Sequence, residues 1–170
     1  MTGGVYTKTS KTQGSSSMVI HASAKELWPL ISDPTQMGKF SPENAGAFWR
    51  DGATKPAVGV RFRGINRRGP AMWFTESVIR TCKINSEFSF DVSFPVVMPD
   101  IAKWTWTLEP ANSDPDATKV TVSWKLPKPI GKTRRLFWNT MGVGDREKDL
   151  AKGTSKTLRE LAAYVEGAHK

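Results

Sequence analysis

The feature that most constrains the fold is the closing stretch, residues 145–166, which has the pattern of one long amphipathic helix. Its apolar stripe, at a 3.6-residue period, is Leu150, Leu158, Leu161 and Val165. Asp145 fits an N-cap, and Gly167 fits a stop just past the stripe. A long helix with one apolar face needs a partner surface, and a curved antiparallel sheet is the obvious one.

The preceding 80 or so residues supply such a sheet, because they alternate between apolar and polar side chains. The clearest case is residues 87–94, where Phe88 and Phe90 alternate with Ser89 and Asp91. The expected strands are residues 17–22, 47–50, 58–67, 72–82, 87–94, 102–108 and 118–126. The stretch 72–82 has an ambiguous phase, with Phe74 on one face and Trp73 on the other.

The N-terminal part predicts a short helical insertion after the first strand. Residues 1–16 read as a flexible tail of small polar residues, and a single domain is expected over 17–170. Ser23 and Glu26 form a capping-box pattern at the start of a helix that ends near Pro34. One more turn is expected before residue 40.

After the strands, residues 130–141 predict a helical piece ahead of the long helix. Gly142 and Gly144 then interrupt it, which fits either a hinge or a plain helix break. Arg134 and Arg135 lie on this piece. They either line the mouth of a cavity, where they could attract an anionic ligand group, or are ordinary exposed helix residues.

Several motifs together resemble the START/Bet v1-like (SRPBCC) superfamily, in particular its actinobacterial polyketide cyclase/dehydrase-type members. The motifs are residues 20–28, 31–34, 40–43, 49–52, 59–69, the strand with Trp104 and Trp106, and the closing helix. The resemblance covers residues 17–166. It implies an α+β helix-grip fold, in which about seven antiparallel strands wrap around the C-terminal helix and two short helices follow the first strand. It also implies an internal cavity for an apolar small molecule.

The formal net charge of +9 is unevenly distributed. Residues 125–170 hold 11 Lys/Arg and 5 Asp/Glu, a balance of +6, whereas residues 18–124 hold 12 and 11, a balance of +1. A solvated outer helix face explains this excess, and a nucleic-acid or anionic-membrane partner is the alternative.

Other classes of protein receive little support from the sequence. Cys82 is the sole cysteine, so an intrachain disulfide is impossible. His21 and His169 lack metal-ligand spacing, and we expect neither a metal nor a cofactor. The N-terminus lacks an apolar signal-peptide core, and no stretch reaches the length of a membrane span, so the expected location is cytoplasmic.

The candidate ligand-binding residues are mostly aromatic side chains on the expected inward phases, since ligand cavities are largely apolar with a few polar groups. The full set is Phe62, Asn66, Phe74, Glu76, Phe88, Phe90, Trp104, Trp106, Trp124, Phe137 and Trp138. For each aromatic residue the alternative is ordinary core packing. Seven Trp and eight Phe are numerous enough for both roles.

Glu76 is the one candidate for acid–base chemistry. It points inward only if Phe74 and Val78 do, and a buried carboxyl there would have a raised pKa. The alternative is that Glu76 pairs with a surface arginine such as Arg63 or Arg80, and a cross-strand pair with Arg63 follows if the two share a face on neighbouring strands. No nucleophile motif or phosphate loop accompanies it.

Three functions fit these patterns. The first is binding of a hydrophobic small molecule, such as a lipid, polyketide or isoprenoid, with Asn66, Glu76 or Arg63 orienting it. The second is a cyclase or dehydratase that uses Glu76. The third is binding to nucleic acid or an anionic membrane through the basic C-terminal segment.

Overall fold

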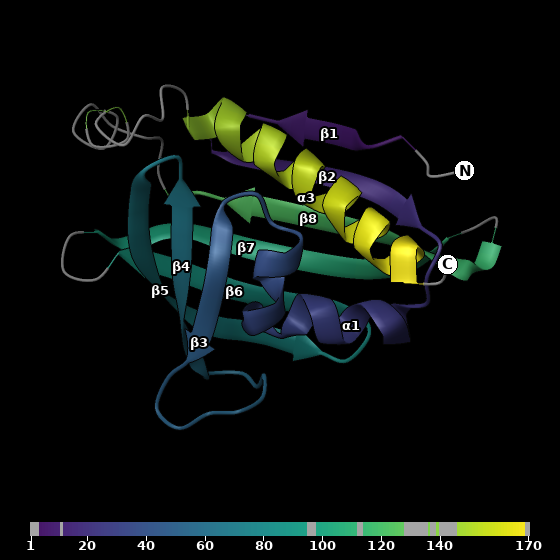
Figure 1. Ribbon diagram of the computed structural model, residues 1–170, viewed down its shortest axis with the longest axis horizontal. Helices are drawn as coiled ribbons and strands as arrows, with labels where there is room; N and C mark the ends of the chain where they lie inside the picture. Colours follow the sequence, from purple (N-terminus) through teal and green to yellow (C-terminus); the bar gives the residue numbers. More distant parts are fainter. Residues whose placement is uncertain are drawn as a thin grey trace.

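The protein folds as one curved antiparallel sheet with its helices on one face (Figure 1). The computed structural model describes residues 4–10, 12–94, 98–111, 114–127, 136, 139 and 146–168. The strands are β1 (Tyr6–Thr9), β2 (Gln13–Ile20), β3 (Asn44–Trp49), β4 (Arg61–Arg68), β5 (Ala71–Lys83), β6 (Glu87–Phe94), β7 (Met98–Ala111) and β8 (Asp114–Lys125). The helices are α1 (Ala24–Ser32), η1 (Pro34–Lys39) and α3 (Arg146–Ala168).

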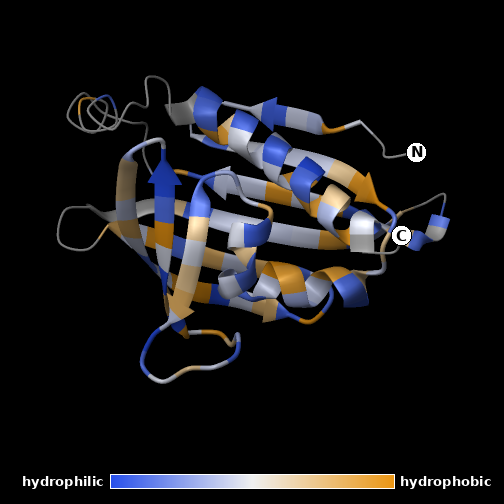
Figure 2. Ribbon diagram, viewed as in Figure 1, coloured by the Kyte–Doolittle hydropathy of each residue, from blue (hydrophilic) through white to orange (hydrophobic). Residues whose placement is uncertain are grey.

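The strand order is β1-β2-β8-β7-β6-β5-β4-β3, and every neighbouring pair is antiparallel. After β2 the chain passes through α1 and η1 to reach the far edge at β3. A meander then runs back strand by strand until β8 pairs with β2. The helices cover what we call the inner face, and the opposite surface is the outer face. Figure 2 shows the alternation of apolar and polar residues as bands along the strands.

The short helices begin where the sequence predicts. The Ser23 side chain accepts a hydrogen bond from the backbone N–H of Glu26, and the Glu26 carboxylate accepts one from the backbone N–H of Ser23. This reciprocal capping box satisfies two donors that would otherwise lack partners at the helix start. Asp33 caps η1 through the backbone N–H of Thr35, at 3.0 Å.

Helix α3 lies over β1, β2 and β8 and leaves β4 to β6 without a helix of this length above them (Figure 1). Its stripe is buried as expected: Leu150, Thr154, Thr157, Leu158, Leu161, Ala162 and Val165. Small side chains let the helix approach the sheet edge, where hydroxyl groups join the two. The Ser16 hydroxyl lies 2.8 Å from that of Thr154, and the Thr7 hydroxyl lies 2.7 Å from that of Ser155.

The architecture predicted from the sequence is confirmed: an α+β helix-grip fold with a curved antiparallel sheet, two short helices after the first long strand, and a closing helix. The described residues form eight strands rather than the predicted seven. The tail predicted for residues 1–16 is the source of this difference, because its described part forms β1 and the first half of β2. This polar segment is held in the sheet by backbone hydrogen bonds, because β2 pairs with β1 on one side and with β8 on the other. Its side chains do not alternate between apolar and polar, so the sequence pattern did not predict a strand here.

A close contact with Trp124 explains the glycine in this segment. A Cβ on Gly14 would lie 2.9 Å from the Trp124 indole ring, so the ring packs directly on the β2 backbone. The helical piece predicted for residues 130–141, with Arg134 and Arg135, and the interruption at Gly142 and Gly144 lie largely outside the described residues.

Candidate functional site

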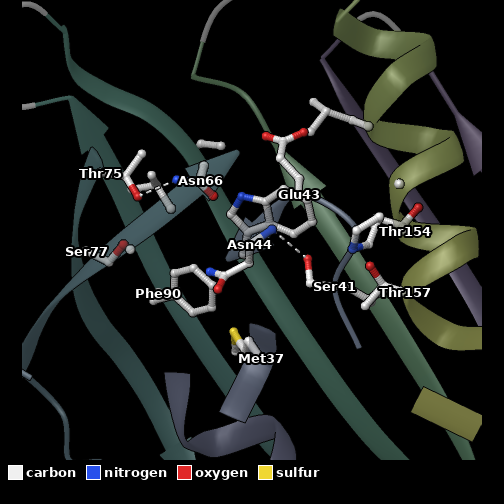
Figure 3. A pocket seen from close by; sticks show the side chains of 18 of the residues that line it. Met37, Ser41, Glu43, Asn44, Asn66, Thr75, Ser77, Phe90, Thr154 and Thr157 are labelled. Atoms are coloured by element: carbon white, nitrogen blue, oxygen red, sulfur yellow. Dashed lines mark hydrogen bonds between the residues drawn. The ribbon is translucent and has the colours of Figure 1, made fainter. Parts of the chain in front are cut away.

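A cavity of about 160 Å³ lies between the inner face of the sheet and α3. Three parts of the chain enclose it: strands β4 to β8, the segment from Met37 in η1 to Asn44 at the start of β3, and the first half of α3 (Figure 3). The cavity sits beside the region that α3 covers, because the helix occupies the β1–β2–β8 side of the inner face.

The wall of the cavity is mainly apolar and aromatic. Among the predicted residues it includes Phe62, Phe90, Trp104 and Trp106. The rings of Phe62 and Phe90 meet edge to face, with centroids 5.2 Å apart, which fixes both side chains against the sheet. Unpredicted apolar members are Met37, Phe40, Trp73, Val92, Val122, Leu126 and Leu150.

Neutral polar side chains enter this wall from three directions: Ser41, Asn44, Asn66, Thr75, Ser77, Thr154 and Thr157. Figure 3 shows Asn66 beside Thr75, where the amide Nδ2 donates to the hydroxyl at 3.3 Å. In the part of the chain that is described, the hydroxyls of Ser77 and Thr157 have no hydrogen-bond partner. The cavity thus offers hydroxyl and amide groups without a net charge deep inside.

An ion pair stands at one end of the cavity. The two terminal nitrogens of the Arg68 guanidinium, Nη1 and Nη2, each donate to one oxygen of the Asp149 carboxylate, and the Nη2 bond is 2.8 Å long. This ion pair joins the β4–β5 hairpin to α3. This hydrogen bond to Asp149 raises the pKa of Arg68 above its ordinary value. Glu43 lies at the same end and contributes a smaller favourable charge interaction with Arg68. The charges of the cavity are therefore confined to its rim.

Phe74 and Glu76 were expected at the cavity and lie instead on the outer face. Trp73, Thr75 and Ser77 are the inward residues of β5, so the opposite phase of this ambiguous strand is the buried one. Phe74 is 46% exposed. Glu76 opposes Arg63 in the register and accepts a hydrogen bond from its guanidinium. The predicted placement of Phe74 and Glu76 in the cavity is therefore wrong. The alternative for Glu76, a cross-strand pair with Arg63, is the one that the structure has.

Phe88 and Trp124 point inward but do not reach the cavity. Phe88 is fully buried against Trp28, with ring centroids 6.4 Å apart and nearly perpendicular planes. Trp124 is buried with Ala102, Leu126 and Leu150 in a smaller core cluster. Both therefore serve packing, which was the alternative for every aromatic candidate. Phe137 and Trp138 lie outside the described residues.

The residues missed by sequence reasoning are those that no alternation marks. Ser41 comes from the irregular connection before β3, and Asn44 is the first residue of β3, where its backbone N–H donates to the Ser41 hydroxyl at 3.2 Å. Asp149 sits one residue before Leu150, on the polar border of the helical stripe. Thr75 and Ser77 share a phase with Trp73 and Ile79, but the opposite phase of β5 is also apolar, so this signal was ambiguous.

Gly153 occupies a helix interior on the cavity side of α3, where a Cβ would meet nothing within 4 Å. Because glycine costs about 0.5–1 kcal/mol relative to alanine in a helix, Gly153→Ala is expected to raise the free energy of unfolding by about that amount. Urea denaturation measures this change. Gly64→Ala is the opposing control, because its Cβ would lie 2.8 Å from the Thr75 hydroxyl, and it should destabilise. A less stable Gly153→Ala would contradict the open space around this position.

Within the described ranges, no group of three His, Cys, Asp or Glu side chains is arranged to hold a metal ion. None of the helices seen in the described residues is long and apolar enough to cross a membrane.

Comparison with known proteins identifies the family. The family model described as "Polyketide cyclase / dehydrase and lipid transport" matches residues 11–166. The chain belongs to this family. A solution structure of the Polyketide_cyc-like protein Cgl2372 from Corynebacterium glutamicum is 25% identical, with a TM-score of 0.61 and 93% of each chain covered. No curated protein matches the chain.

Two further solved structures share the fold of this polyketide cyclase/dehydrase family member. Protein Ms6760 from Mycobacterium smegmatis is 15% identical over 99% of this chain and 100% of its own, with a TM-score of 0.64. DynU16, from the dynemicin biosynthetic locus, is 19% identical with a TM-score of 0.63, and the match covers 92% of this chain and 48% of DynU16. At these identities the likeness concerns the fold alone.

Proposed function

We propose that this protein binds a small, largely apolar molecule in the cavity between the sheet and α3. The observation that carries the proposal is the composition of the cavity wall, which combines aromatic side chains with neutral hydroxyl and amide groups. Apolar burial provides the affinity, at about 25 cal/mol per Å² of surface removed from water. The family description, which names both cyclisation and lipid transport, is compatible with such a ligand.

The polar groups define what the ligand carries. Ser77 on β5 and Thr157 on α3 face the cavity from opposite walls and lack partners in the described residues (Figure 3). A hydroxyl both donates and accepts, so a ligand carbonyl or hydroxyl group would satisfy either one. The proposed ligand therefore has one or two neutral oxygen functions on an apolar frame.

The size of the cavity favours a compact ligand. A cavity of about 160 Å³ is comparable with engineered apolar cavities of roughly 150 Å³ that accept a benzene ring. One ring or a short folded chain fits this space, whereas a long acyl chain would have to extend past the rim.

We favour binding over catalysis because Glu76, the candidate for acid–base chemistry, does not line the cavity. Glu76 lies on the outer face with Arg63, away from any cavity-bound substrate. No His, Lys or Cys lines the cavity among the described residues, and its carboxylates are Glu43 and Asp149 at the rim. A cyclase reaction here would depend on folding the substrate rather than on a buried proton donor.

The test of the proposal is thermal unfolding with three neutral probes: toluene, naphthalene and 4-phenylbutanamide. Saturation at 100 times the dissociation constant stabilises a protein by about 2.7 kcal/mol, which corresponds to a rise of roughly 5–10 °C in Tm for a chain of this size. At least one probe is expected to produce such a rise and to change tryptophan fluorescence, since three Trp residues line the cavity.

A matched pair of variants assigns the binding to the cavity. Thr157→Phe projects a ring into the cavity and should abolish the Tm shift while the protein stays folded. Ala163→Phe places the same ring on the exposed face of the same helix and should leave the shift unchanged. Equal effects of the two variants, or no shift in the wild type with any probe, would overturn the proposed function.

A further inference from the structure

A second hollow adjoins the cavity at the rim and carries a net positive charge. This feature, which we call the basic groove, lies between the β4–β5 hairpin tip and the outer side of α3. Its charged residues are Arg67, Arg68, Lys152 and Lys156 against Glu43 and Asp149. Four basic and two acidic side chains give the groove a net charge of +2.

The basic groove and the cavity are lined by common residues, so the two spaces lie back to back. Pro42, Glu43, Asn44, Asp149 and Gly153 border both. On α3 the division follows helical geometry, because residues three or four apart share one side of a helix. Lys152 and Lys156 line the groove alone, whereas Leu150, Thr154 and Thr157 line the cavity alone.

Gly153 lies on the border itself and has no side chain to separate the two spaces. A Cβ at this position would meet nothing within 4 Å, so free space continues across the helix surface here. The chain thus accepts a poor helix former at the point where cavity and groove meet.

Three of the four groove cations lack a carboxylate partner among the described residues, unlike several cations of the sheet. Arg61, Arg63, Arg80, Lys83 and Lys119 each pair with an acidic side chain of the sheet or of the β3–β4 connection. In the groove, Arg68 and Asp149 neutralise one another. Among the described residues, Lys152, Lys156 and Arg67 have no ion-pair partner within 4.0 Å. Their charges remain available to an anion, with Glu43 as the opposing charge.

We infer that the ligand is amphipathic, with its apolar part in the cavity and an anionic group, a carboxylate or a phosphate, held in the basic groove by Lys152 and Lys156. This inference rests on the proposed function and adds the charge of the ligand to it. The neutral cavity would discriminate against a buried anion, because an unpaired charge is costly to desolvate, so the acid group belongs at the solvated rim.

The test compares the affinities of 4-phenylbutyrate, 4-phenylbutyl phosphate and neutral 4-phenylbutanamide by isothermal titration calorimetry. These probes share one ring and one four-carbon chain. At low salt the two anions are expected to bind about tenfold more tightly than the amide, and roughly 0.5 M salt should remove most of the difference. The phosphate and carboxylate arms show which anion the groove prefers.

Paired variants locate the charge effect. Lys152→Gln/Lys156→Gln should reduce anion affinity to that of the amide and leave amide affinity unchanged. The control Lys8→Gln/Lys25→Gln removes the same charge from exposed lysines outside the groove and should preserve the tenfold preference. The charge-conserving Lys152→Arg/Lys156→Arg should retain it as well.

The outcomes separate the two proposals. If the amide binds and the anions bind no more tightly, or if the control loses the preference as fully as the groove variant, the anionic ligand is refuted and cavity binding stands. If no probe binds, both the inference and the proposed function fail.

Discussion

Phe88→Ala is expected to lower the free energy of unfolding by about 3–5 kcal/mol, the usual cost of removing a buried aromatic ring. Phe88 is fully buried in the main core cluster. Its ring meets Trp28 of α1 edge to face and lies 5.7 Å from the ring of Phe90. Removal leaves an internal void and loosens the contact of α1 with the sheet. Urea denaturation followed by circular dichroism measures the change.

The control is Phe90→Ala, two residues along the same strand. Phe90 borders the cavity, so its loss enlarges an existing space and should change probe affinity more than Phe88→Ala does. Phe88→Ala should leave the dissociation constant of a bound probe nearly unchanged at temperatures where the variant is folded. If Phe88→Ala altered affinity more than Phe90→Ala, the division between core and cavity would be wrong.

Leu158→Ala is expected to destabilise the protein by about 2–5 kcal/mol. Leu158 is fully buried at the middle of α3 and belongs to the same core cluster as Ile20 of β2 and Val120 of β8. The apolar stripe carries much of the attachment of α3, since its residues are buried against the sheet. Chemical denaturation again provides the measurement.

Leu158→Met separates packing from helix propensity. Methionine is a comparable helix former of similar volume, so this variant should cost less than about 1.5 kcal/mol. A loss as large as that of Leu158→Ala would mean that the shape of the side chain, rather than the void, dominates. A loss below 1 kcal/mol for Leu158→Ala itself would contradict its burial.

Strong periodicity made most of the fold predictable from the sequence. Residues 87–94 alternate without interruption and form β6 with the predicted bounds. The closing helix was found within two residues at its ends, because its stripe is long and regular. β1 was missed because Tyr6–Thr9 is exposed throughout and pairs with β2 through backbone groups, which leave no side-chain pattern.

The candidate site was only partly predictable, for a physical reason that β5 illustrates. Both phases of this strand carry large apolar residues, and Phe74 is as apolar as Trp73, so hydrophobicity could not decide the buried face. Small polar residues that line a cavity, such as Thr75 and Ser77, also resemble solvent-facing residues in sequence. Glu76 shows the opposite case, a residue that its apolar neighbours in sequence suggested was buried. It lies on the outer face, where its carboxylate accepts a hydrogen bond from Arg63.

The position of α3 over β1, β2 and β8 divides the inner face into two regions under different constraints. Where the helix is docked, substitutions act directly on folding. The residues of β4 to β6 that line the cavity, such as Thr75 and Phe90, face a space, so they can change in size and polarity at a smaller cost in stability than core residues such as Phe88. Ligand preference in a protein built this way can therefore diverge along the β4–β6 half while the helix-bearing half stays constant.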